Sequence, residues 1–155
     1  MNHRAFTLIE LLVVVAIIGI LAAVGVVAYN GYTGAAKVSV TKTIHSQTVK
    51  YISAEIQKCS LGESTIMDSL SCSNIDANKV VLHIGTSGAI LKDKNPYDTS
   101  KPAVQNAGGM VLGQVSIERK GDNINVYTCY KTGCVFNWQN ASNTGKSITA
   151  FILVE

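Results

Sequence analysis

The stretch LLVVVAIIGILAAVGVVAY, residues 11–29, decides how this chain is organised. It holds no charged and no strongly polar side chain, and it is longer than the roughly 18 residues at which a membrane-spanning helix is the expected structure. As an α-helix it would be about 28 Å long, close to the apolar thickness of a bilayer. The stretch therefore predicts a helix that spans a membrane or lies in an equally apolar environment.

A secretory signal peptide is the alternative explanation of this stretch, because Arg4 precedes it. The apolar core of a signal peptide has about 7–15 residues and is followed by a small-x-small cleavage site. Here the apolar run is longer, Glu10 stands at its front edge, and Ala28-Tyr29-Asn30 does not form such a site. A retained apolar helix is the better interpretation.

Charge is distributed unevenly along the 155 residues, whose formal net charge is +3. Arg4 and Glu10 are the only charged residues before Lys37, so an apolar stem precedes a polar head. The length suits one domain in addition to the stem. A net charge this small gives no support to a nucleic-acid partner, which stays possible but unsupported.

The four cysteines all lie beyond the apolar run, at Cys59, Cys72, Cys129 and Cys134. If the head is exported, an even number of cysteines indicates two disulfides. A zinc site is the less favoured alternative, because Cys59 and Cys72 are far apart and lack a neighbouring His. Four cysteines allow three pairings. We expect Cys59–Cys72 and Cys129–Cys134, since each pair brackets a short segment that has to turn.

The helix is expected to continue past the apolar run as a single element from Phe6 to about Lys58, because no proline occurs before Pro96. Between Ala36 and Cys59 the sequence has helical periodicity. The polar face of this part carries Ser39, Lys42, Thr43, Ser46, Lys50, Ser53 and Gln57. The expected apolar face consists of Ala36, Val40, Ile44, Tyr51, Ile52, Ile56 and Cys59.

The remainder of the chain shows strand patterns. Strands are predicted at residues 79–84, 110–119, 123–130, 135–138 and 147–154, with a hairpin turn at Lys120-Gly121-Asp122. Gly62 is expected to end the helix, residues 61–78 to form a loop with a short helical turn at 65–70, and residues 92–109 to form a loop. The predicted fold class is α+β, with a long N-terminal helix packed against a C-terminal antiparallel β-sheet.

No catalytic constellation is present in the sequence. It lacks G-x-S-x-G, a phosphate-binding glycine loop and H-E-x-x-H. His45 lies on the predicted helix and His83 in a predicted strand, and structural roles are expected for both. We therefore expect no enzymatic activity and no cofactor.

A family resemblance rests on the residues around the apolar run. Ala5-Phe6-Thr7-Leu8-Ile9-Glu10-Leu11, the run itself and then Ala28-Tyr29-Asn30-Gly31-Tyr32 resemble the N-terminal signature of bacterial type IV pilins over about residues 1–37. The resemblance implies a leader, residues 1–5, that a prepilin peptidase removes by cleavage between Ala5 and Phe6. It also implies N-methylation of Phe6. Relatives usually have Gly where this chain has Ala5, and many have a proline near Val27.

What the resemblance implies for the whole chain is a structural subunit of a type IV pilus. Residues 6–30 would be the membrane and filament-core helix and residues 31–155 the head, with the second half of the helix reaching about residue 59. The expected partners are further copies of the chain, the prepilin peptidase and N-methyltransferase, the pilus assembly platform and the inner membrane. The subunit would be stored in the inner membrane with its head outside the cytoplasm and would then form an extracellular pilus.

Several points stay open from the sequence. The leading alternative is a pseudopilin of a type II secretion system, and a monomeric membrane-anchored binding protein explains the apolar run but not the residues before it. Adhesion, motility and DNA uptake are not distinguished. Related pseudopilins bind calcium in a loop at a similar position in the chain. Asp93, Asn95 and Asp98 are therefore weak candidates for calcium ligands.

The resemblance assigns a role in filament assembly to Glu10. A carboxylate in a bilayer costs roughly 3 kcal/mol on insertion scales unless it has a partner. Cleavage before Phe6 would create a positively charged amine, and Glu10 of one subunit is expected to meet the Phe6 amine of its neighbour. A residue that only reaches the membrane surface is the alternative for Glu10.

Overall fold

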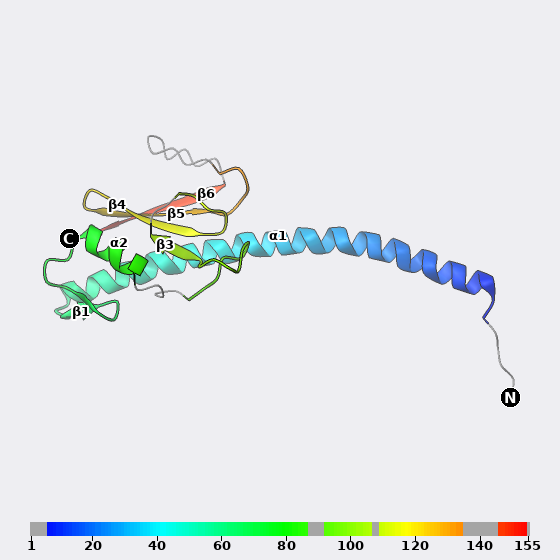
Figure 1. The fold of residues 1–155 in the computed structure, drawn as a ribbon, viewed down its shortest axis with the longest axis horizontal. Coiled ribbons are helices and arrows are strands. Elements are labelled where there is room, and N and C mark those ends of the chain that lie inside the picture. The colour runs from blue at the N-terminus through cyan, green and yellow to red at the C-terminus, as the bar shows by residue number, and fades with distance from the viewer. Residues whose placement is uncertain (1–5, 87–91, 107–108, 135–145, 155) are drawn as a thin grey trace, which may run out of the picture. The chain divides into compact units, whose positions relative to one another are not determined.

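The computed structural model describes residues 6–86, 92–106, 109–134 and 146–154 (Figure 1). Its helices are α1 (Leu8–Ser60) and α2 (Ala77–Thr86). Its strands are β1 (Thr65–Ile66), β2 (Leu70–Ser71), β3 (Val104–Asn106), β4 (Val115–Lys120), β5 (Asn123–Cys129) and β6 (Ser147–Leu153). The chain divides into two units, residues 1–36 and residues 37–155, and α1 contributes to both.

Helix α1 has nearly the predicted bounds, and Gly62 ends it as expected. Gly62 has φ +95°, a conformation that glycine adopts without steric cost. Its N–H donates to the Cys59 carbonyl, and the Glu63 N–H donates to the Lys58 carbonyl, both at 3.1 Å. These two bonds form a Schellman motif, which satisfies the last carbonyls of the helix.

The part of α1 in the first unit leaves its apolar side chains uncovered. Ile20 is 67% exposed and Leu21 is 66% exposed, and the other large side chains of residues 11–27 are similar. Among the described residues, α1 is the one helix long and apolar enough to cross a membrane, with a mean hydropathy of 3.1 in its most apolar window. An apolar surface of this extent requires lipid or other protein around it.

The second unit packs a four-stranded sheet against the later part of α1, shown in cyan to green in Figure 1. The buried face of the helix consists of Thr41, Ile44, His45, Thr48, Ile52, Glu55 and Ile56. Inward-facing side chains of the sheet complete the core, among them Val115, Ile117, Ile124, Val126 and Ile152. The expected apolar face was partly wrong, because Ala36 and Val40 are exposed while Thr41 and Thr48 are buried.

The order of the sheet is β3-β4-β5-β6. The predicted hairpin is confirmed: β4 and β5 are antiparallel, with Lys120 opposite Asn123 and the turn at Gly121-Asp122. Strand β6 adds to β5 antiparallel, close to its predicted bounds. The expectation of a purely antiparallel sheet was wrong, because β3 runs parallel to β4. Strand β3 also lies in the segment predicted as a loop, and the predicted strand at 135–138 lies outside the described residues.

The strand predicted at residues 79–84 is in fact part of helix α2. The Lys79 N–H donates to Asp76 Oδ1 at 2.8 Å, so Asp76 acts as the N-cap. The buried residues Ala77, Val80, Val81 and Ile84 have helical spacing and belong to the core. Capping and helical spacing therefore prevail over the β-branched run Val80-Val81.

The helical turn predicted at residues 65–70 was also wrong, since β1 and β2 pair there as a small antiparallel hairpin. Its turn places Met67 and Asp68 at positive φ, 48° and 68°. The Met67 N–H donates to Glu55 Oε2 at 2.7 Å, and His83 Nε2 lies 2.8 Å from the Met67 carbonyl oxygen. Contacts with both helices hold a turn that non-glycine residues seldom adopt.

His45 lies in the interface between α1 and the sheet. It is 5% exposed, and its Nδ1 lies 2.9 Å from Thr128 Oγ1 on β5. Burial lowers the pKa of His45 below the ordinary value of 6.5, because an apolar environment disfavours the charged imidazolium.

We predict that the head loses stability as the pH falls below about 6.5, since the unfolded chain then binds a proton that folded His45 does not. The loss continues down to the lowered pKa of the folded state and has a slope of at most about 1.4 kcal/mol per pH unit for one proton. Urea unfolding in detergent between pH 7 and pH 5 measures this slope. His45→Gln should show a smaller slope than the wild type, and equal slopes would contradict the prediction.

Candidate functional site

The start of α1 carries the candidate site, centred on Glu10. Thr7 precedes the helix as its N-cap, and Glu10 is the third helical residue. The Thr7 N–H and Oγ1 both donate to Glu10 Oε2, at 2.8 and 2.7 Å, and the Glu10 N–H donates to Thr7 Oγ1 at 3.3 Å. This reciprocal pattern is a capping box, which satisfies amide groups that have no partner within the helix.

The sequence signal for this motif is the T-x-x-E spacing of residues 7–10. The sequence-based interpretation gave Glu10 either an intermolecular partner or a place at the membrane surface and did not include a bond to Thr7. In the structure one oxygen, Oε2, receives both Thr7 donors. Within the part of the chain that the structure describes, no hydrogen bond to Oε1 is observed. One carboxylate oxygen therefore remains available to a further donor.

Glu10 faces an open groove of about 360 Å³ that Phe6, Ile9, Val13 and Val14 also line. Glu10 is the one charged residue of this lining. Phe6 and Ile9 are 82% and 69% exposed, so the surroundings of the carboxylate are apolar and uncovered. An apolar environment strengthens any interaction of this carboxylate with a cation.

The expected processing position lies directly before this site. Phe6 is the first residue that the structure describes, and Ala5 lies outside the described residues. An amine created at Phe6 would stand one residue before the N-cap Thr7. It would also lie at the positive end of the helix dipole, where a carboxylate such as Glu10 is favoured.

The four cysteines lie in two pairs in the head. Cys59 and Cys72 have their Cα atoms 5.4 Å apart and join the end of α1 to the residue after β2. Cys129 and Cys134 have their Cα atoms 6.0 Å apart and close the turn after β5. Both separations fall in the range that disulfides require.

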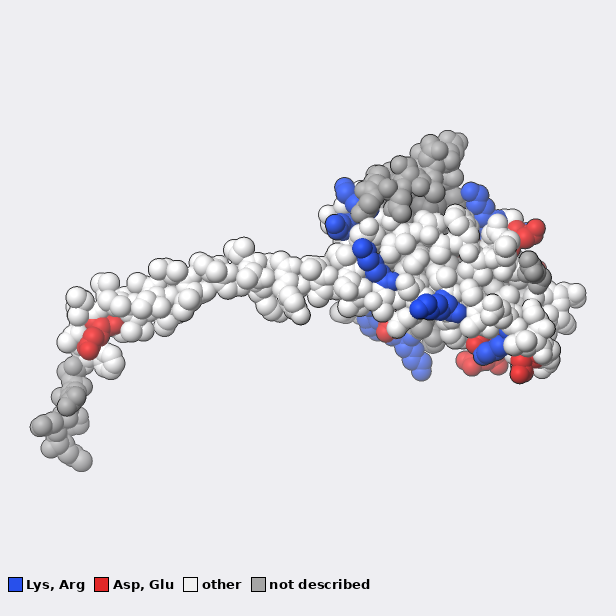
Figure 2. Space-filling model, turned by 180° about the vertical axis from the view of Figure 1, so that it is seen from behind, with Lys and Arg blue, Asp and Glu red and all other residues white. Residues whose placement is uncertain are grey.

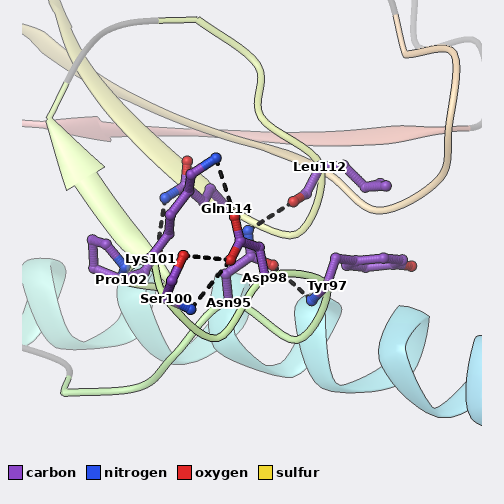
Figure 3. A network of polar contacts seen from close by, with 8 residues as sticks. All are labelled: Asn95, Tyr97, Asp98, Ser100, Lys101, Pro102, Leu112 and Gln114. Atoms are coloured by element: carbon purple, nitrogen blue, oxygen red, sulfur yellow. Dashed lines mark hydrogen bonds and ion pairs between the residues drawn. The ribbon is translucent and has the colours of Figure 1, made fainter.

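Asn95, one of the calcium candidates, is a structural residue of the loop before β3 (Figure 3). It is fully buried, its Nδ2 donates to the Leu112 carbonyl at 2.8 Å, and its Oδ1 accepts the Tyr97 N–H at 2.8 Å. In the same network Gln114 Nε2 donates to the Pro102 carbonyl at 2.8 Å. The amide oxygen that a calcium ion would use is therefore engaged within the loop.

Asp98 has internal partners as well. Its Oδ1 accepts hydrogen bonds from the Ser100 Oγ–H and N–H, at 2.5 and 3.2 Å, and its Oδ2 lies 3.1 Å from Lys101 Nζ. The Ser100 and Lys101 hydrogen bonds lower the pKa of Asp98. The Asp93 carbonyl accepts the Ala103 N–H at 2.9 Å. No group of three His, Cys, Asp or Glu side chains suited to a metal ion occurs in the described residues.

Comparison with known proteins adds to this geometry. Residues 1–26 match the family model of the prokaryotic N-terminal methylation motif. The chain is similar to the type IV major pilin protein PilE of Neisseria gonorrhoeae and to a fimbrial protein of Neisseria meningitidis serogroup B, strain ATCC BAA-335 / MC58. Each is 61% identical over 37 residues, which are 24% of this chain and 22% of the relative. No solved structure is significantly similar.

The first 26 residues thus carry an N-terminal methylation motif. The N-terminal segment is similar to that of type IV pilins. A long apolar helix that continues into a helix-on-sheet head is consistent with the type IV pilin fold. The resemblance is to a structural subunit rather than to an enzyme. The chain spans about a fifth of the length of the curated relatives that it matches.

We predict that Thr7→Val loosens the start of α1, because it removes the hydroxyl that joins the cap to Glu10. The loss of an N-cap costs about 1 kcal/mol, so the Glu10 amide, which donates to the Thr7 hydroxyl, should exchange with solvent about fivefold faster in detergent micelles. Thr7→Ser keeps the hydroxyl and serves as the matched control. Unchanged exchange in Thr7→Val would show that the capping box does not form in solution.

Proposed function

We propose that this chain is the structural subunit of a type IV pilus. In this proposal residues 1–5 are removed as a leader, residues 6–30 form the membrane and filament-core segment, and residues 31–155 form the head. Prepilin peptidase cuts before Phe6, an N-methyltransferase modifies the new N-terminus, and the assembly platform moves the subunit from the inner membrane into an extracellular filament. The methylation motif and the uncovered apolar part of α1 support this sequence of events.

One observation carries the proposal: a carboxylate in an apolar groove with an oxygen left without a partner. An amine at Phe6 of a neighbouring subunit supplies the donor that Oε1 lacks. The capping box stays intact in such a pair, because Thr7 uses only Oε2. Glu10 can thus hold its own helix and its neighbour's N-terminus at the same time.

The charge pair sets the register of assembly because apolar burial alone cannot. Lipid tails are as apolar as the packed helices of a filament core, so moving the stem from one to the other changes the burial of its Leu, Ile and Val side chains little. Packing also tolerates several shifts between smooth apolar helices. A single carboxylate per stem has its partner in only one stagger, and every other stagger leaves it unpaired at a cost of several kcal/mol.

The disulfides suit the proposed location of the head outside the cytoplasm, where cysteines become oxidised. Cys59–Cys72 closes a loop with a sequence separation of 13, which contributes about 3 kcal/mol in the chain-entropy model, and Cys129–Cys134 closes a shorter loop, which contributes less. A head held in this way keeps its shape when its subunit leaves the membrane.

We predict that Glu10→Ala leaves the chain processed and inserted in the membrane but abolishes most filaments, since the neighbouring amine loses its partner. Electron microscopy of the cells, with a membrane fraction as the measure of insertion, tests this. Glu63→Ala removes an exposed acid of the head and should leave filaments normal. Normal piliation in Glu10→Ala would refute the mechanism, and short fibres in the wild type would favour a secretion pseudopilin instead.

Mass spectrometry of the mature chain tests the processing steps. We expect an N-terminus at Phe6 that carries a methyl group, and, without reduction, peptides that link Cys59 to Cys72 and Cys129 to Cys134. An N-terminus that still begins at Met1 in cells with active prepilin peptidase would contradict the proposed processing. A link from Cys59 to either late cysteine would contradict the pairing.

A further inference from the structure

Two lysines of the head, Lys37 and Lys42, lie over tyrosine rings, and Lys131 and Lys146 are backbone neighbours of one of these tyrosines. The four lysines together are named the basic surface. Lys37 Nζ lies 5.5 Å from the centre of the Tyr97 ring, and Lys42 Nζ lies 4.4 Å from that of Tyr130. The Tyr97 hydroxyl donates to the Tyr130 carbonyl at 2.7 Å, which joins the Tyr97 side chain to the backbone of Tyr130.

The other two lysines, Lys131 and Lys146, are neighbours of Tyr130 along the backbone. Lys131 follows Tyr130 in the chain, and the Tyr130 N–H donates to the Lys146 carbonyl at 3.0 Å. Segments far apart in sequence thus bring their lysines to one end of the head. The cation–π contacts fix Lys37 and Lys42 there without neutralising their charge.

The basic surface has little acid to balance it. The ion pairs in the described residues are Glu55 with Lys58 and Asp98 with Lys101, and neither includes a lysine of the basic surface. The other charges in the loop near Tyr97 are Lys92, Asp93 and Lys94. A cationic excess therefore remains.

Several acids of the head lie at its opposite end, together with Lys58 and Lys79. Glu55 contacts the β1–β2 turn, which includes Asp68, and Asp76 caps α2 beside that turn. Figure 2 shows red side chains gathered toward one end of the head on the face displayed, with blue ones more frequent at the other end.

The position of the basic surface in the chain points to its partner. Lys37 is the first charged residue after Glu10 and follows Tyr29, the end of the apolar run, by eight residues. Eight helical residues extend about 12 Å, which exceeds a headgroup layer of about 5–8 Å by less than one Debye length. Tyr29 and Tyr32, 68% and 76% exposed, are the type of residue enriched where a membrane meets water.

We propose that the basic surface docks on anionic phospholipid headgroups of the membrane that stores the subunit. This inference rests on the membrane-stored form in the proposed function. Lysines next to a membrane span are attracted to anionic lipids, and salt weakens this attraction. Docking holds the head on the membrane before assembly. When the subunit is extracted, the lysines leave the headgroups as the stem leaves the lipid.

The test uses the full chain in nanodiscs, where both membrane faces are open to reagents. Discs of phosphatidylcholine alone are compared with discs that also contain phosphatidylglycerol, and an amine-acylating reagent with mass spectrometry measures each lysine. In the anionic discs the four lysines should react about fivefold more slowly, and about 1 M salt should restore their reactivity. Lys79 and Lys120, at the other end of the head, are internal controls and should not change.

A charge-reversed variant tests whether the surface acts as a unit. Lys131→Glu with Lys146→Glu leaves both cation–π contacts in place and should remove the protection of Lys37 and Lys42 in anionic discs. Lys79→Glu with Lys120→Glu is the matched control, in which Lys37 and Lys42 should stay protected. Loss of protection only in the first variant supports docking on lipid.

Several results would overturn the inference. Equal lysine reactivity in the two kinds of disc would show that the lysines do not bind anionic lipid. Protection in neutral discs that grows with protein concentration would assign the surface to a second copy of the chain. Protection in neutral discs only after duplex DNA is added would assign the surface to nucleic acid. A chain that does not enter discs at all would refute the membrane-stored form itself, which distinguishes failure of the proposed function from failure of this inference.

Discussion

The structure depends on the requirement that one continuous helix, α1, satisfy two different environments. From Leu11 to Tyr29 its side chains are apolar on all sides, and nothing in their unit covers them. From Thr41 onward only one face is buried, against a sheet, and the remaining positions carry polar and charged residues. A helix that is apolar all round requires lipid or packed helices, whereas a one-sided helix is soluble once its buried face is covered.

The head is built to cover that one face and to fix its two ends. Toward the end of α1, the Schellman motif at Gly62, the Cys59–Cys72 bridge and the bond from Glu55 to Met67 attach the β1–β2 hairpin. Nearer its entry, Lys42 stacks on Tyr130 and His45 meets Thr128. Between these points lies an aliphatic core of Ile and Val. The same helix thus provides both the wall of the core and the anchors of the loops.

At the other end of α1, a single carboxylate has two compatible roles. As part of the capping box, Glu10 secures the first turn of a helix whose start would otherwise leave amides unsatisfied in an apolar environment. As an acceptor with one oxygen to spare, it offers a polar contact in an otherwise apolar groove. Lysines become frequent only beyond the stem, so in residues 6–155 charged side chains are confined to the first turn of α1 and to the head.

Some features followed from the sequence alone because their causes are local. The apolar run defines the stem by composition, the absence of early prolines keeps α1 continuous, and Gly62 ends it where a positive φ is needed. The β4–β5 hairpin follows from alternation around Gly121. The sequence also holds signals for the capping box and for helix α2, namely the T-x-x-E spacing and the capping residue Asp76.

Other features were decided only by tertiary structure. Val40 is exposed and Thr41 buried because the sheet meets α1 at a particular rotation, and helical periodicity alone does not fix that rotation. Thr41 and Thr48 are tolerated there because their hydroxyls donate to the carbonyls of Lys37 and Ile44 within the same helix, each at 2.8 Å. Strand β3 exists because β4 offers it an edge, and three residues carry no signal of their own. The basic surface likewise joins lysines that only the fold brings together, because its contacts span residues 37 to 146.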